Sequence, residues 1–249
     1  MNKRFKEMIK RLFDIFISLF GLLLLSPILI VFMYLIYRQD KASPFYMALR
    51  TGKSDTSFKM VKLRSMVSDA DKSGVSSTSN NDIRITPIGQ KIRRYKLDEL
   101  TQLWNVLIGD MSLVGPRPQV KLDTDLYTNI ERKLLSVQPG ITDFSSIVFS
   151  DEGEILKGKD DPDLTYNQLI RPWKSRLGLI YVENQSFLLD IKLIIYTIVA
   201  IISKQRALNW VVSQLKILNV DSDVVNISKR EVELYPFPPP GMNEVVVFR

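Results

Sequence analysis

The sequence predicts a mainly helical α+β fold built on a membrane-embedded N-terminal helix. A long apolar run near the N-terminus supplies the membrane helix, helical periodicity recurs further along the chain, and only short segments alternate as strands do. The chain has 249 residues, 45% hydrophobic and 24% charged. It can therefore bury a real core in one or two domains, and it is neither disordered nor an ordinary multi-span membrane protein.

Two residue types are missing, and their absence limits the chemistry. The sequence contains no cysteine, which excludes disulfides, thiolate nucleophiles and Cys-based metal sites and fits a reducing compartment. It also contains no histidine, which excludes a Ser-His-Asp triad, a His general base and His metal ligands. Any catalysis must therefore use carboxylates, Lys, Tyr, Ser or Thr, or a cation bound by oxygen ligands.

The apolar run Ile15–Tyr37 carries no charge over its whole length. As a helix it reaches about 34 Å, slightly more than the hydrocarbon core of a bilayer. A cleaved signal peptide fits poorly, because the run is too long and no small-residue cleavage site follows it. Hydropathy alone therefore favours a helix that spans the membrane once.

Two features of this run count against a straight span. Ser26 and Pro27 lie in its middle, where a proline removes a backbone hydrogen bond and kinks a helix. Basic residues also flank both ends, so the positive-inside rule gives no orientation. Basic residues at both ends are expected of a helix that enters one leaflet, bends and returns to the same side. A second apolar stretch, Leu193–Ile202, is too short to span and is interpreted as a buried or interfacial helix.

The next part of the chain is polar or weakly periodic. Ser57–Met66 alternates loosely between turn-rich segments and is predicted to be a strand. Asp69–Asp82 is rich in Ser and Asn and is interpreted as a surface loop that can become ordered over a ligand. Thr86–Lys96 is predicted to be a short basic helix, with Pro87 near its start.

The clearest helix follows Asp98, with Gly109 at the position of a C-terminal cap. One apolar stripe runs along it at helical spacing: Leu100, Leu103, Trp104, Leu107 and Ile108.

Beyond this helix the predictions are less regular. Val114–Pro118 is a stiff turn that holds Arg117 between two prolines. Asp123–Leu135 is predicted to be a helix and Ile141–Ser150 a strand. The proline-rich segment Pro236–Gly241, between short β-like pieces, is interpreted as an extended tail or a small added element.

Asp98 and Glu99 are the candidate chemical groups. Acidic residues in a first helical turn usually serve as caps. Here, however, basic residues surround the pair in sequence: Arg84, Lys91, Arg93, Arg94, Lys96 and Arg117. Cations at a helix start form an anion site, typically for phosphate, and nearby positive charge is expected to lower the pKa of a carboxylate. Such a carboxylate can act as a nucleophile on phosphorus or bind Mg²⁺ beside phosphate oxygens.

Other interpretations of this basic cluster remain open. It can rest on anionic lipid, which suits a chain with a membrane segment. Nucleic-acid binding is weaker, because aromatic residues are not interleaved with the charges. Trp104 and Trp173 are interpreted as core or membrane-interface residues. The sequence has neither a Walker motif nor a GxGxxG motif.

Several segments in order resemble the bacterial sugar transferases, which are monotopic polyprenyl-phosphate phosphoglycosyl transferases. The resemblance runs from about Lys10 to about Lys204. It is carried by KRLFDIFISLFGLLLLSP (Lys10–Pro27), KLRSM (Lys62–Met66), RITPIGQKIRRYKLDELTQLWNVLIGDMSLVGPRP (Arg84–Pro118), PGIT (Pro139–Thr142) and SFLLDIK (Ser186–Lys192). The third segment is long and specific. The chain resembles the small form of this family, without a large N-terminal membrane domain.

The resemblance implies a two-step reaction. A UDP-sugar binds with Mg²⁺, an Asp attacks the phosphate next to the sugar, and UMP leaves. Undecaprenyl phosphate then takes the phosphosugar from the Asp, giving a polyprenyl-diphospho-sugar at the start of surface glycan assembly, such as O-antigen, capsule or another glycoconjugate. The implied location is the cytoplasmic face of the bacterial inner membrane. Phospholipid is the implied contact and nucleic acid is not a partner, while the oligomeric state is left open.

The resemblance also assigns residues. Asp98 is the implied nucleophile and Glu99 its partner, and both are candidate Mg²⁺ ligands. Arg93 and Arg117 are candidate anion-binding residues, and a neighbouring loop contributes Lys62, Arg64 and Ser65. Asp14 with Ser26-Pro27 resembles the re-entrant helix of the family, which reverses the preference for a span drawn from hydropathy.

The implied organisation has three parts: a re-entrant membrane helix in 1–40, a cytoplasmic catalytic domain in 41–206, and an extension of unknown role in 207–249. Departures from the family pattern include Thr101 in place of a proline, Asp143 in place of a common glycine, and an altered segment Pro44–Gly52. They leave the sugar undetermined. The alternatives are a membrane-anchored basic scaffold and a degenerate transferase without turnover.

Overall fold

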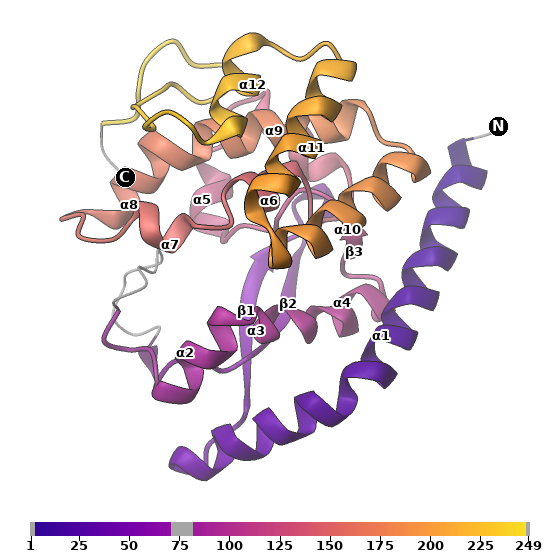
Figure 1. Ribbon diagram of the computed structural model, residues 1–249, viewed down its shortest axis with the longest axis vertical. Helices are drawn as coiled ribbons and strands as arrows, with labels where there is room; N and C mark the ends of the chain where they lie inside the picture. The colour runs from indigo at the N-terminus through magenta and orange to yellow at the C-terminus, as the bar shows by residue number, and fades with distance from the viewer. Residues whose placement is uncertain (1–2, 71–81, 248–249) are drawn as a thin grey trace.

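The computed structural model describes residues 3–70 and 82–247. Figure 1 shows a mostly helical protein with two small sheets, which confirms the mainly helical α+β class. The α-helices are α1 (Lys3–Asp40), α2 (Pro87–Arg94), α3 (Leu97–Leu100), α4 (Gln102–Ile108), α5 (Lys121–Asp125), α6 (Phe144–Val148), α7 (Glu152–Ile155), α8 (Pro162–Thr165), α9 (Arg171–Glu183), α10 (Phe187–Ile202), α11 (Lys204–Ile217) and α12 (Ser222–Lys229). The strands are β1 (Phe45–Thr51), β2 (Ser57–Leu63), β3 (Ser112–Val114) and β4 (Gly140–Thr142). The short helical turns are the 3₁₀ segments η1 (Lys53–Asp55) and η3 (Glu131–Ser136) and the π-helix η4 (Tyr166–Ile170).

Helix α1 is long, apolar and bent. Among the described residues it is the one helix long and apolar enough to cross a membrane. Figure 1 shows it as two limbs that meet at an angle. Pro27 lies inside the helix, and the Ser26 hydroxyl donates to the carbonyl of Leu23 at 2.8 Å. Many large apolar side chains of α1 are exposed, as expected of a helix that can be embedded in lipid: Phe16, Leu19, Phe20, Leu23, Leu24, Ile28, Ile30 and Val31.

Polar contacts fasten the first limb of α1 to the rest of the protein. Lys10 pairs with Asp190 of α10 at 2.7 Å, and Asp14 is buried and accepts the Ser112 hydroxyl at 2.8 Å. Arg11 donates to two carbonyls in the last turn of α4, at 2.5 and 2.8 Å. A cation at this position compensates the unsatisfied carbonyls of a helix C-terminus. Three of the charged residues that precede the apolar run are therefore held by the globular part of the protein.

The second limb returns to the same globular part. A small core forms where this limb meets β2 and α2, from Leu29, Ile36, Leu63 and Ile92. At the end of α1, the carboxylate of Asp40 accepts two hydrogen bonds from the Arg64 guanidinium, at 2.5 and 2.6 Å. Two parallel bonds of this kind form a geometrically specific pair. Both ends of α1 are thus bound to one body.

The two sheets are small and have different topologies. β1 and β2 form an antiparallel hairpin in which Phe45 pairs with Leu63. The predicted strand at 57–66 is confirmed as β2, although it ends at Leu63, whereas β1 was not predicted. β3 and β4 are parallel. Next to them a Cβ on Gly140 would collide with the backbone of Gly115, so this close approach requires glycine.

Two predicted elements are wrong. The helix expected over 123–135 is divided into α5 and η3, because the Glu131 carboxylate turns inward and accepts the backbone N–H of Thr128 at 3.0 Å. The strand expected over 141–150 ends at Thr142, and α6 begins two residues later at Phe144. Asp143 caps this helix by accepting the N–H of Ser146 at 2.8 Å.

The C-terminal half supplies most of the main core. Trp173 is 1% exposed inside it, and Leu193 of α10 is fully buried. The opposite face of α10 exposes Ile195, Ile198, Ile201 and Ile202. The predicted buried or interfacial helix is therefore confirmed as a helix with one buried and one exposed apolar face. The helices α11 and α12 were not predicted. The expected boundary at 206/207 falls inside α11, and the segment around 236–241 is extended, without strands on either side.

Candidate active site

The segment that carries Asp98 and Glu99 is shaped by a sharp turn. The predicted basic helix at 86–96 is confirmed as α2, which Thr86 caps by accepting the N–H of Gly89 at 2.9 Å. Lys96 then adopts a left-handed conformation with φ of 55°, and α3 begins at once with Asp98 and Glu99 in its first turn. This reversal turns both carboxylates away from the axis of α2.

The single helix predicted after Asp98 is two short helices that meet at Thr101. The Thr101 hydroxyl donates to the carbonyls of Val61 and Asp98, both at 3.0 Å, so it ties this junction to β2. Gly109 has φ of +100° at the end of α4, which confirms the predicted cap. The stripe is only partly buried, because Trp104 and Ile108 are exposed.

Two cationic side chains from two other segments meet the two carboxylates of α3. Glu99 accepts Arg117 at 2.8 Å, and Lys62 of β2 lies 3.9 Å from Asp98. Arg117 projects from the turn after β3, where two prolines restrict the backbone. The Asp98 side chain is 14% exposed, so the group remains accessible from solvent. We call Lys62, Asp98, Glu99 and Arg117 the Asp98 cluster.

The charges of the Asp98 cluster shift its pKa values in different directions. Burial raises the pKa of Asp98, and the neighbouring Glu99 carboxylate adds to the effect. The prediction of a lowered pKa for Asp98 is therefore wrong, because desolvation outweighs the surrounding cations. Burial also acts to raise the pKa of Glu99, but Arg117 leads the opposing charges and the net shift is downward. Burial and Arg117 together lower the pKa of Lys62 to about 8.

Two further predicted residues lie beside the cluster and one does not. The Nε of Arg93 donates to the Ser65 hydroxyl at 3.1 Å. Burial lowers the pKa of Arg93, and the charge of Asp98 opposes this shift. Arg64 is directed away, since its guanidinium is held by Asp40 at the end of α1. This contact shows that Arg64 holds the end of α1 against the rest of the protein. Most of the predicted loop at 69–82 lies outside the described residues.

A cavity of about 610 Å³, open solvent at its mouth included, continues from Arg117 into the C-terminal half. Its polar and aromatic lining includes Thr51, Asp123, Tyr127, Asp143, Tyr166, Arg171 and Lys174. Lys174 forms an ion pair with Glu152, and the Glu152 carboxylate also contributes to raising the pKa of Arg117. Sequence reasoning missed Glu152 and Lys174. The one available signal was the basic segment around Trp173, and no spacing connects it to Glu152.

The cluster suits a cation that is completed by substrate. Among the described residues, no group of three or more His, Cys, Asp and Glu side chains could hold a metal ion by itself. Mg²⁺ typically uses one or two carboxylates together with substrate phosphates and water. Asp98 and Glu99 supply two adjacent carboxylates, and Arg117 and Lys62 supply positive charge for phosphate. The residues present therefore fit Mg²⁺ bound together with a phosphorylated substrate.

A partly buried carboxylate pair among cations, beside a long apolar helix, is the arrangement expected of a transferase of phosphorylated groups. The family model for bacterial sugar transferases matches residues 5–204, so the chain belongs to the bacterial sugar transferase family and is a phosphoglycosyl transferase.

Curated relatives agree with this assignment. EpsL of Bacillus subtilis, named as an uncharacterized sugar transferase, is 35% identical over 76% of this chain and 85% of its own length. The exopolysaccharide production protein PSS of Rhizobium leguminosarum is 36% identical over 80% of this chain and 97% of its own length. A UDP-glucose:undecaprenyl-phosphate glucose-1-phosphate transferase of Klebsiella pneumoniae is 33% identical over 76% of this chain and 39% of its own length.

Proposed function

We propose that the protein transfers a sugar phosphate from a UDP-sugar to undecaprenyl phosphate, giving an undecaprenyl-diphospho-sugar and UMP. The observation that carries this proposal is the Asp98 cluster, in which a partly exposed carboxylate lies among fixed cations. The relatives, which include a UDP-glucose:undecaprenyl-phosphate glucose-1-phosphate transferase, support the same donor and acceptor classes. The reaction starts the assembly of a surface glycan.

In the first step, an oxygen of Asp98 attacks the phosphorus next to the sugar. The new bond joins Asp98 to phosphorus, and the bond from phosphorus to the bridging oxygen breaks, so that UMP leaves with the electron pair. In the second step, an oxygen of undecaprenyl phosphate attacks the same phosphorus and the bond to Asp98 breaks. Each step conserves charge and needs no proton donor, which agrees with a chain that has no histidine.

The other cluster residues bind and orient the phosphates. Arg117 is held by Glu99, so its guanidinium is fixed before substrate arrives. Arg93 and Lys62 add positive charge on the α2 and β2 sides. Mg²⁺, when bound by Asp98 and Glu99, supplies a Lewis acid that neutralises the diphosphate and the developing charge on the leaving UMP. These fixed charges lower the repulsion between the attacking carboxylate and the phosphates.

We also propose that α1 is re-entrant and that the enzyme is monotopic at the cytoplasmic face of the inner membrane. The bend near Pro27 and the fastening of both ends of α1 to one body support this topology. The exposed Trp104 on α4 supports a position of the cluster near the lipid headgroups, where Trp is favoured. An acceptor phosphate at that depth reaches Asp98 without leaving the membrane.

The test is UMP release from a panel of UDP-sugars with undecaprenyl phosphate and Mg²⁺. The wild type is expected to release UMP with at least one donor, and Asp98→Asn is expected to release none while keeping its thermal unfolding and membrane binding. Asp125→Asn, which removes an exposed carboxylate, is the matched control and is expected to retain full activity. Mass spectrometry with donor alone should find a phosphosugar on Asp98. An active Asp98→Asn variant would contradict Asp98 as the nucleophile, and a wild type that releases no UMP with any donor would favour a basic scaffold.

A further inference from the structure

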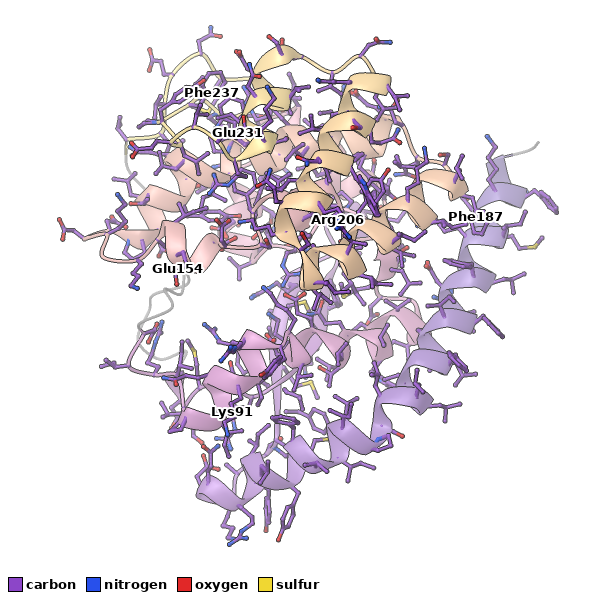
Figure 2. All side chains as sticks on the ribbon, viewed as in Figure 1. Lys91, Glu154, Phe187, Arg206, Glu231 and Phe237 are labelled. Carbon is purple, nitrogen blue, oxygen red and sulfur yellow. The ribbon has the colours of Figure 1, made fainter. Side chains whose placement is uncertain are left out.

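Residues 205–247 follow the last residue that the family model matches and pack against the rear of the cavity wall. We call them the C-terminal segment. In Figures 1 and 2 its last part, which carries the labelled residues Glu231 and Phe237, forms an extended tail beside α9 and α12. Three of the contacts made by this tail and by the end of α12 lie next to residues of the candidate active site.

The first contact is with Trp173 of α9. Phe237 stacks on the buried Trp173 ring, with ring centroids 4.4 Å apart, and Tyr235 meets the same ring edge-on at 6.0 Å. The Arg176 guanidinium lies 4.7 Å from the centroid of the Phe237 ring and donates to the Pro238 carbonyl at 2.9 Å. This aromatic and cationic packing fixes the start of α9 from the side opposite the cavity.

The second contact is with η4. This π-helical turn lies directly before α9, and Gln168 lies in its middle. The N–H of Phe237 donates to the Gln168 carbonyl at 3.1 Å, and the Gln168 amide donates to the Val246 carbonyl at 2.8 Å. A π-turn departs from the regular α-helical hydrogen-bond pattern, and the tail supplies a partner for a carbonyl within it. On the cavity side, the same turn begins with Tyr166.

The third contact is with Asp151, at the start of α7. Arg230, the residue that ends α12, lies 3.3 Å from the Asp151 carboxylate and its guanidinium lies over the Phe149 ring. Lys204, at the start of α11, pairs with the same carboxylate at 2.7 Å. Asp151 is therefore held from the ends of both C-terminal helices.

The residues held in this way are the chain neighbours of an ion pair at the cavity. Asp151 precedes Glu152, Trp173 precedes Lys174, and Glu152 and Lys174 pair with one another. Lys174 lines the cavity, and Glu152 lies close enough to Arg117 to stabilise its charge. The C-terminal segment thus fixes both halves of the pair from behind.

We propose that the Glu152–Lys174 pair binds the sugar of the donor and that the C-terminal segment, through Arg230 and Phe237, positions this pair. An ammonium donor beside a carboxylate acceptor offers both kinds of partner that sugar hydroxyl and amide groups need. Since the two charges neutralise one another, the pair favours a neutral sugar over a uronic acid. This proposal rests on the proposed function, because it names the part of the donor that this wall recognises.

The test combines steady-state kinetics with a double-mutant cycle. Lys174→Met is expected to raise the donor KM about tenfold, with a smaller change in kcat, because it removes a charge-assisted hydrogen bond. Phe237→Ala is expected to raise the donor KM about threefold through loss of the aromatic packing. In the Lys174→Met background, Phe237→Ala is expected to add almost nothing. Additive effects would contradict positioning through Lys174, and an unchanged KM in Lys174→Met would contradict sugar binding.

Two controls separate positioning from general stability. Val232→Ala truncates an exposed apolar side chain of the same tail and is expected to leave KM unchanged, and Phe237→Tyr is expected to restore the stacking and the KM. Hydrogen exchange adds a readout that needs no turnover, because Phe237→Ala should reduce amide protection over 166–176, where Phe237 contacts Trp173 and Gln168. Unchanged protection would overturn the positioning role even in an active enzyme. An active Asp98→Asn variant would instead overturn the proposed reaction and leave the exchange result standing.

Discussion

Glu99 and Arg117 form an ion pair of 2.8 Å that joins the helix carrying Asp98 to the turn after β3. The two residues come from different segments, and each shifts the pKa of the other toward its charged form. The pair therefore fixes a guanidinium beside the candidate nucleophile before any substrate binds.

Replacement of Arg117 tests this arrangement. Arg117→Ala is expected to lower kcat/KM roughly 100-fold or more, because a fixed donor to the transferred phosphate is lost. Arg117→Lys keeps the charge but lacks the planar fork, so an intermediate activity is expected. UMP release measures both effects, with the exposed Arg132→Ala as control. Wild-type activity in Arg117→Ala would show that the reaction does not need the Arg117 guanidinium.

The titration of Lys62 is expected to set the alkaline limb of the pH profile. Its pKa is lowered to about 8, so it is protonated below that pH and loses its charge as the pH rises through it. Donor affinity should therefore decrease above about pH 8. In Lys62→Arg, which stays charged, the alkaline limb should move to higher pH. An identical alkaline limb in the two proteins would assign the titration to another group.

Metal removal tests the candidate ligands Asp98 and Glu99. EDTA is expected to abolish UMP release and Mg²⁺ to restore it, with Ca²⁺ less effective because it prefers more oxygen ligands and a looser geometry. The thermal midpoint should hardly change, since the cation is completed by substrate and does not connect structural elements. Full activity in EDTA would show that the reaction does not need a metal ion.

The buried pair of Glu131 and Arg171 offers a test of stability. Their side chains are 0% and 4% exposed, and Arg171 donates at 2.7 and 3.1 Å to the two carboxylate oxygens. Glu131→Ala leaves a buried positive charge without this partner and is expected to lower the free energy of unfolding by about 3–5 kcal/mol. Denaturant titration measures the change, with the exposed Glu231→Ala as control. A smaller loss in the double variant with Arg171→Met would identify the uncompensated charge as the cause.

The topology of α1 can be tested with single cysteines, because the chain has none of its own. Lys6→Cys lies before the apolar run, and Lys59→Cys lies in β2 after it. With a re-entrant helix, an impermeant thiol reagent should label both positions in inside-out vesicles and neither in intact spheroplasts. Labelling of the two positions from opposite sides would establish a span.

The sequence predicted the elements whose signals are local. α2, α4 with its Gly109 cap, β2 and the long apolar α1 each have a capping residue, a period or a hydropathy that appears within a few residues. The two wrong elements, at 123–135 and 141–150, depend on partners far along the chain or on a capping bond. Glu131 turns inward to meet Arg171, and Asp143 starts a helix that hydrophobicity alone presented as a strand.

The site was predictable to a similar extent. The segment Arg84–Pro118 identified Asp98, Glu99 and Arg117 as candidate site residues. The structure brings these three residues together with Lys62. The direction of the Asp98 pKa shift was not predictable, since a charge count along the sequence contains no information on desolvation. Glu152 and Lys174 were missed because the ion pair that joins them forms between residues 22 positions apart, and no local pattern indicates it.

Arg11 has a consequence for the geometry of the whole enzyme. It closes the end of α4, whereas Asp98 lies near the start of α3, so these two short helices form the spacer between them. The position of the candidate nucleophile relative to the first limb of α1 is therefore set by the length of α3 and α4. An insertion or deletion within 102–108 would shift Asp98 relative to the first limb of α1, even where every side chain of the Asp98 cluster is intact.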